Sequence, residues 1–151
     1  MNNFKIQISN NKKHFNKNVL DNFDQYVDER INILYSKSDL DLCRIKSSGD
    51  CLALASITKR DRGKICKEFN CIDSSESDSM FVLNLYINHG IKIFELLGNS
   101  FFFFMYDFKK NDVFIIRDHI GFNNIYYAKD KGNLFLSSTL KGLQELSGKK
   151  N

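Results

Sequence analysis

The feature that most constrains this fold is an unbroken run of apolar residues at positions 101–106. Four consecutive phenylalanines open the run, so it lacks the alternation of apolar and polar residues that marks a half-buried strand. A strand of this kind needs cover on both faces, as in one of two stacked sheets that are themselves capped by helices. The run is far too short to cross a bilayer, because a membrane-spanning helix takes about 20 residues.

Weaker patterns predict the remaining elements. Residues 4–9 alternate as a strand does, and turn residues at 47–50 join two expected strands. Apolar residues at helical spacing predict a helix within 19–31, and an amphipathic helix at 81–89 is expected to end in a left-handed cap at Gly90. The other expected strands are 31–35, 42–45, 51–55, 113–116, 125–127 and 134–136, and the other expected helices are 62–69, 91–97 and 139–146.

The order of these elements indicates the fold class. Mixed strands come first, then two helices, an antiparallel meander and one last helix, an order that favours an α+β layered fold. A polar stretch at 10–18 is expected to be a loop. With 151 residues, the chain fits one compact domain with a core large enough to be stable without disulfides.

Charge and cysteine usage exclude several classes of function. The chain has 22 basic and 18 acidic residues, a net charge of +4, and its lysines are scattered rather than gathered into a stripe. We therefore expect no nucleic-acid partner. The four cysteines lack metal-ligand spacing, and neither a secretory signal nor a membrane span is visible, so we expect no membrane partner. We expect a cytoplasmic protein with reduced, mostly buried thiols and with no metal or cofactor.

Four sequence blocks in the second half of the chain resemble a known family. The blocks are 77–86, 90–107, 117–127 and 134–143. The third is the most distinctive, and it places Arg117, Asp118, Gly121, Tyr126 and Tyr127 at signature positions. With these blocks in this order, the chain resembles the N-terminal glutaminase domain of asparagine synthetases, which are class II glutamine amidotransferases.

The resemblance implies an N-terminal-nucleophile hydrolase-like αββα sandwich of two stacked, mostly antiparallel sheets. The N-terminal half is shorter than the family's, and we expect residues 1–151 to form a single glutamine amidotransferase type 2-like domain. Another interpretation is a small α+β protein that is unrelated to this family. A structure without two stacked sheets would favour it.

The chemistry that the resemblance implies needs an N-terminal cysteine whose own α-amine acts as the base. Here the second residue is Asn2 and the first cysteine is Cys43, so the expected nucleophile is missing. Cleavage before Cys51 would create a new N-terminal cysteine, which makes Cys51 the alternative nucleophile. The family's oxyanion-hole asparagine falls at Ala55-Ser56, where neither side chain can replace an amide donor.

Two residues remain as candidates for binding glutamine. Asp78 stands where the family binds the α-amine of glutamine, but any aspartate before an apolar helix can be a helix N-cap, and without the family's partner residues we favour the N-cap. Arg44 is the basic residue that could hold the substrate carboxylate. We expect no chemistry from the histidines, which are His14, His89 and His119.

The sequence therefore predicts a degenerate glutaminase-like domain. It would act as a docking or structural module for a separate ATP-dependent amide- or lactam-forming synthetase, with an exposed apolar patch near residues 117–127 facing that partner. The alternative is an active glutamine amidohydrolase that supplies ammonia in trans to an asparagine synthetase-type partner.

Overall fold

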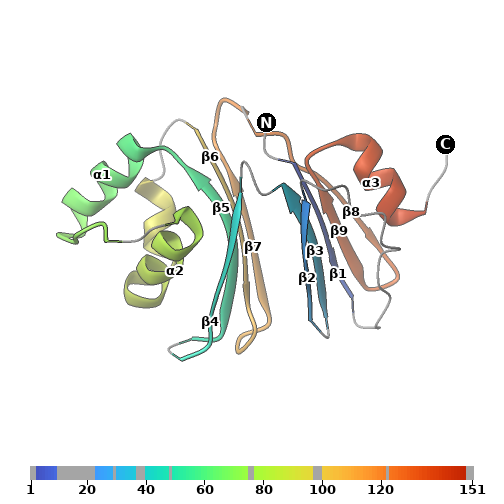
Figure 1. Cartoon of the computed structure of the whole chain (residues 1–151), viewed down its shortest axis with the longest axis horizontal. Helices are drawn as coiled ribbons and strands as arrows, with labels where there is room; N and C mark the ends of the chain where they lie inside the picture. Colours follow the sequence, from blue (N-terminus) through green and yellow to red (C-terminus); the bar gives the residue numbers. More distant parts are fainter. Residues whose placement is uncertain are drawn as a thin grey trace. The chain divides into compact units, whose positions relative to one another are not determined.

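The computed structural model describes residues 3–9, 23–28, 30–36, 40–47, 49–74, 77–96, 100–121 and 123–148. Its strands and helices form two compact units. The first unit joins the two ends of the chain, Met1–Leu40 and Asn124–Asn151, and the second is the continuous stretch Asp41–Asn123. Each unit contains one antiparallel sheet with helices (Figure 1).

The first unit is a five-stranded sheet in which all neighbouring strands are antiparallel. Helix α3 (Leu140–Ser147) packs on β1 (Phe4–Ile8), β8 (Tyr126–Asp130) and β9 (Asn133–Ser137). The ion pair between Lys5 of β1 and Glu145 of α3 also joins the helix to the sheet. In order across the sheet, the strands are β2 (Phe23–Val27), β3 (Ile31–Ser36), β1 (Phe4–Ile8), β9 (Asn133–Ser137) and β8 (Tyr126–Asp130).

Gly142 permits the close approach of α3 to the sheet. A Cβ atom at this position would lie 2.3 Å from Oγ of Ser137 and 2.9 Å from Oγ1 of Thr139. Both hydroxyls have structural roles, since Thr139 caps the helix by accepting from the Gly142 N–H and Ser137 Oγ donates to the Phe4 carbonyl. A larger residue at 142 would therefore displace the start of α3.

The second unit is a four-stranded sheet with helices on one face (Figure 1). The strands of this sheet, in order, are β4 (Asp41–Ile45), β5 (Cys51–Ile57), β6 (Phe101–Asp107) and β7 (Asp112–Arg117). The helices of the unit are α1 (Lys59–Glu68), α2 (Asp78–His89) and the 3₁₀ helix η1 (Gly90–Leu96). Strand β6 is buried at every position, as the phenylalanine run predicts.

The helices of the second unit pack on one face of β5 and β6. Phe103 and Met105 of β6 join the apolar residues of α2 and η1 in one buried cluster. The ring of Phe94 in η1 connects the layers, because it lies 5.1 Å from the ring of Phe103 and 5.7 Å from that of Phe114. No helix in the described ranges is both long and apolar enough to span a membrane.

The predicted α+β class is confirmed, and the two antiparallel sheets are compatible with an N-terminal-nucleophile hydrolase-like fold. Most predicted strands and helices are present with shifts of one to three residues at their ends. The predicted loop at 10–18 lies outside the described residues.

Three local predictions were wrong. Residues 23–27 form strand β2, because pairing with β3 outweighs the helical spacing of their apolar residues. The last four strands do not form one meander, since β6–β7 and β8–β9 belong to different sheets. Gly90 does cap α2, but its φ of 67° and ψ of −149° lie outside the left-handed region, and the chain continues directly into η1.

Candidate functional site

The candidate site lies where strand β5 ends and helix α2 begins. Ser77 is the N-cap of α2 and accepts a hydrogen bond from the Met80 N–H, so the predicted capping role of Asp78 was wrong. Asp78 is the first residue of the helix, and its Oδ2 accepts from the Ile57 N–H at 2.9 Å. Its carboxylate therefore connects the start of α2 to the last residue of β5.

The second carboxylate oxygen of Asp78 binds a buried arginine. Arg62 of α1 is only 8% exposed, and its Nη1 donates to Asp78 Oδ1 at 2.9 Å. Its Nε and Nη2 both donate to the carboxylate of Asp73, and its guanidinium lies 4.6 Å from the centre of the Phe81 ring. The hydrogen bonds to Asp73, with those to Asp78, raise the pKa of Arg62 although burial opposes the charge. We call Arg62, Asp73 and Asp78 the Arg62 cluster.

The position at which the sequence comparison by motif led us to expect the oxyanion-hole asparagine, Ala55-Ser56, is occupied by internal hydrogen bonds. The Ala55 N–H donates to Oγ of Ser79 at 2.8 Å, and that hydroxyl in turn donates to the Asp41 carbonyl at 2.6 Å. Ser79 is fully buried, so this bridge joins β4, β5 and α2. It is a structural link within the second unit.

Cys51, the alternative nucleophile, is buried at the start of β5 and is 1% exposed. It lines a small pocket of about 190 Å³, together with Gly49, Tyr86, Ile87, Asp107, Lys109 and Lys110. Burial, and then the negative charge of Asp107, raises the pKa of the Cys51 thiol to about 11. The thiol is therefore protonated at neutral pH and a weak nucleophile.

The polar residues of this pocket bind one another. Tyr86 donates from its hydroxyl to Asp107 Oδ2 at 3.3 Å and accepts from Lys110 Nζ at 3.2 Å. Asp107 Oδ1 accepts from the N–H groups of Lys109 and Lys110. Asp107 thus orders the turn after β6.

Arg44, the candidate for the substrate carboxylate, has a structural partner. Its Nε donates to Asp50 Oδ1 at 2.9 Å, and its guanidinium lies 4.0 Å from the centre of the Phe108 ring. Because Arg44 and Asp50 flank the turn between β4 and β5, the pair stabilises that hairpin.

The signature turn after β7 is organised by Asp118. This residue is 2% exposed, its Oδ1 accepts from the Gly121 N–H, and its Oδ2 accepts from Asn123 Nδ2. Gly121 has φ +78°, a conformation that favours glycine. Asp118 and Gly121 are therefore required for the turn itself, while Arg117 and His119 are exposed.

Among the described residues of the block 117–127, three apolar side chains are exposed, one in the second unit and two in the first. Ile120 is 66% exposed, and Tyr126 and Tyr127 of β8 are 38% and 68% exposed. Strand β8 is an edge of the five-stranded sheet, so its outer side has no strand partner among the residues that the structure describes.

The remaining candidates are histidines and cysteines. The ring of His89 stacks on that of Phe69 at 4.3 Å, and His14 lies outside the described residues. Within the described ranges, no group of three or more histidine, cysteine or acidic residues could hold a metal ion. Cys51 alone is fully buried among the four cysteines, so the prediction of mostly buried thiols was wrong.

Neither the Arg62 cluster nor the role of Ser79 was predicted from the sequence. Arg62 precedes Asp73 by 11 positions and Asp78 by 16. No short motif connects residues at such separations. The one usable signal was that an arginine within the predicted helix 62–69 follows an apolar strand.

Comparison with known proteins gives three matches. A family model described as a glutamine amidotransferase domain matches residues 65–151, more than half of the chain. An asparagine synthetase (glutamine-hydrolyzing) of Brassica oleracea is 33% identical over 70 residues, which are 46% of this chain and 12% of the plant protein. A Methanocaldococcus jannaschii protein, provisionally named asparagine synthetase (glutamine-hydrolyzing) 2, is 30% identical over 88 residues, 56% of this chain and 17% of the archaeal one. The chain thus spans less than a fifth of either relative.

Proposed function

This chain belongs to the family of glutamine amidotransferase domains, and we propose that it is a degenerate member without glutamine hydrolysis. It acts as a docking or structural module for a separate ATP-dependent amide- or lactam-forming synthetase. Its similarity to asparagine synthetases supports a partner of this type. We assign both units to one domain, and we place it in the cytoplasm, where structural disulfides are rare.

The observation that carries this proposal is the engagement of Asp78. The resemblance assigns this aspartate to the α-ammonium group of glutamine, which requires a free carboxylate. Here one oxygen accepts from the Ile57 N–H and the other pairs with Arg62. Arg62 is shared with Asp73 and neutralises Asp78 only in part, but Arg62 and the Ile57 N–H together engage both carboxylate oxygens, so an ammonium group placed at Asp78 would have to compete with them.

The oxyanion position supports the same conclusion. Ala55 and Ser56 provide no side-chain amide, and the Ala55 N–H is engaged by Ser79. Loss of one oxyanion donor costs on the order of 10²–10³ in turnover. The Cys51 thiol, with its pKa of about 11, supplies no thiolate at neutral pH to compensate.

The docking role is supported by β8. Tyr127 is 68% exposed on an edge strand, and tyrosine presents a large apolar ring with a polar hydroxyl at low entropic cost.

The first test measures glutamine hydrolysis by the purified chain, together with the intact mass of that chain. We expect no ammonia release above that of the Cys51→Ala variant, and no heat of glutamine binding by calorimetry. Ammonia release that disappears in Cys51→Ala or in Asp78→Asn, with folding verified by circular dichroism, would overturn the proposal. Intact mass identifies any chain cut before Cys51.

The second test addresses docking. A synthetase-type protein from the same organism would be co-purified with the wild-type chain and with two variants. We expect Tyr127→Ala to weaken the complex at least tenfold and Ile72→Ala to leave it unchanged, since Ile72 is 91% exposed but belongs to the other unit. Equal binding by both variants would exclude the β8 edge as the docking surface.

A further inference from the structure

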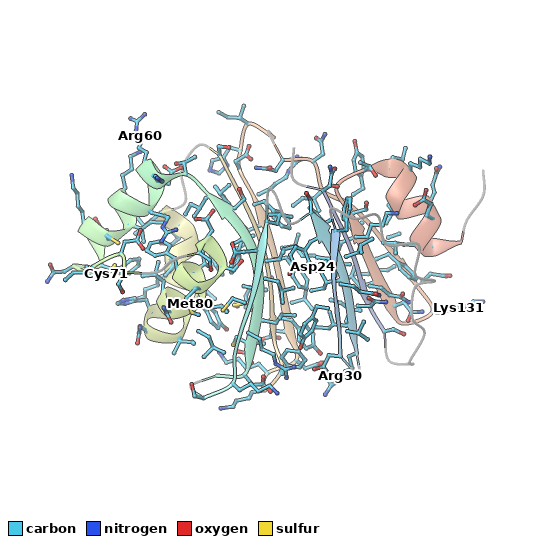
Figure 2. The ribbon with its side chains drawn as sticks, in the orientation of Figure 1. Asp24, Arg30, Arg60, Cys71, Met80 and Lys131 are labelled. Carbon is cyan, nitrogen blue, oxygen red and sulfur yellow. The ribbon has the colours of Figure 1, made fainter. Side chains whose placement is uncertain are left out.

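Two cysteines meet at the end of helix α1. Sγ of Cys66 lies 3.3 Å from Sγ of Cys71, and both residues are only partly buried as free thiols. Cys71 lies just beyond the helix (Figure 2). The two residues are five apart in sequence, a spacing outside the familiar C-x-x-C pattern, which is why the sequence analysis gave them no joint role.

The backbone holds the two thiols together. The Cys71 N–H donates to the Cys66 carbonyl at 2.9 Å, and the Asn70 N–H donates to the Lys67 carbonyl. Asn70 has φ +48°, so α1 ends in a Schellman motif, in which a left-handed residue brings the flanking side chains into contact. That contact is usually hydrophobic, and here a thiol stands on each side of it.

We propose that Cys66 and Cys71 form a reversible oxidation site, which low-molecular-weight disulfides of the glutathione class convert into an intramolecular disulfide. One protein thiolate attacks a sulfur of the glutathione disulfide, forms a mixed disulfide and releases one glutathione thiolate. The second cysteine then attacks the protein sulfur of the mixed disulfide and releases the second glutathione. The two protein thiols lose two electrons and two protons, and the glutathione disulfide gains them as two glutathione thiols.

The geometry requires only a small movement. A disulfide bond is about 2.05 Å long, so the sulfurs must approach by little more than an ångström from their positions across the capped turn. Burial, and then the neighbouring Cys71, raises the pKa of the Cys66 thiol to about 11. A dithiol whose thiolate is not stabilised favours its disulfide form, whereas a stabilised thiolate favours reduction.

The other two cysteines lack such a partner. The sulfur near Cys43 is the thioether of Met80 at 3.7 Å, which cannot form a disulfide. Cys51 is buried in β5. Cys43 is therefore the matched control, because it is a partly buried thiol beside a sulfur atom that is not a thiol.

The test uses the full chain in glutathione redox buffers, followed by acid quenching, alkylation and intact mass. In excess glutathione disulfide, we expect Cys66 and Cys71 to become resistant to alkylation in the wild-type chain and in Cys43→Ser. Before alkylation, each chain should weigh two hydrogen atoms less than its reduced form. Peptide mapping should place the bond at residues 66 and 71, and dithiothreitol should restore both thiols. Cys66→Ser and Cys71→Ser should instead retain one glutathione as a stable adduct.

Two results would overturn the proposal. One is a wild-type chain that keeps both thiols alkylatable in excess glutathione disulfide. The other is a wild-type chain that accumulates a glutathione adduct on Cys71 without closing the bond to Cys66. Both readouts come from the wild-type chain, so a serine variant that folds poorly does not affect the conclusion.

Discussion

Replacing Arg62 by methionine tests the Arg62 cluster directly. The substitution keeps an unbranched side chain against Phe81 but removes the charge that faces Asp73 and Asp78. Both carboxylates would then lie close together without a counter-ion, and the cation–π contact would be lost.

The magnitude follows from the burial of the three groups. Removing one partner of a fully buried ion pair costs about 3–5 kcal/mol, because an uncompensated charge remains. The side chains of Asp73 and Asp78 are 31% and 26% exposed, so water screens part of that penalty. We therefore expect Arg62→Met to lower the free energy of unfolding by about 2–3 kcal/mol, including about 0.5–1 kcal/mol from the cation–π contact.

Urea unfolding followed by far-ultraviolet circular dichroism measures this loss. The matched control is Lys64→Met on the same helix, because the Lys64 side chain is 53% exposed and its ammonium lies 4.0 Å from the Asp61 carboxylate. The control should change the free energy of unfolding by less than about 0.5 kcal/mol. If Arg62→Met destabilises the chain no more than this control, the cluster does not hold α1 to α2 and our account of Asp78 fails. A double-mutant cycle with Asp78→Asn would isolate the pairwise coupling, expected at about 1–2 kcal/mol.

Three further predictions concern packing and protonation. Gly142→Ala should lower the thermal midpoint and cost about 1–3 kcal/mol, since the new Cβ would meet Ser137 Oγ at 2.3 Å; an unchanged midpoint would mean that α3 shifts freely. Phe103→Ala, at a site 1% exposed, should cost about 3–5 kcal/mol in urea unfolding, and a loss below about 1 kcal/mol would contradict the packing of β6 on η1. The Cys51 thiol has a pKa of about 11 in the folded chain against about 8.5 in the unfolded chain. Unfolding therefore releases a proton at any pH between these two pKa values, and the free energy of unfolding falls as the pH rises through this window. Cys51→Ala should flatten this alkaline decline, as measured by urea unfolding at pH 7 and pH 10; an identical slope in both chains would assign the decline to other groups.

The sequence was sufficient where one local signal dominated. The phenylalanine run predicted a strand buried on both faces, and β6 is buried along its whole length. A helix N-cap was expected at Asp78, and the capping side chain belongs to the preceding residue, Ser77.

The sequence was insufficient where partners distant in the chain decide the structure. Strand β2 is formed by its pairing with β3, against its own helical spacing. The role of Asp78 depends on Arg62, a residue 16 positions earlier on another helix. Likewise, the approach of Cys66 to Cys71 depends on the left-handed conformation of Asn70, which an asparagine after a helix permits but does not require.

The first unit combines two segments that are far apart in the sequence, so its strands are synthesised at different times. Strand β1 pairs with β3 soon after both emerge, but its other neighbour, β9, lies near the far end of the sequence. The Phe4 N–H, for example, finds its acceptor on Ser138 after 134 further positions. The whole second unit is a continuous stretch that emerges in between and can fold first. Until β9 arrives, β1 presents an open apolar edge, so a nascent or stalled chain is exposed to strand pairing with its own copies.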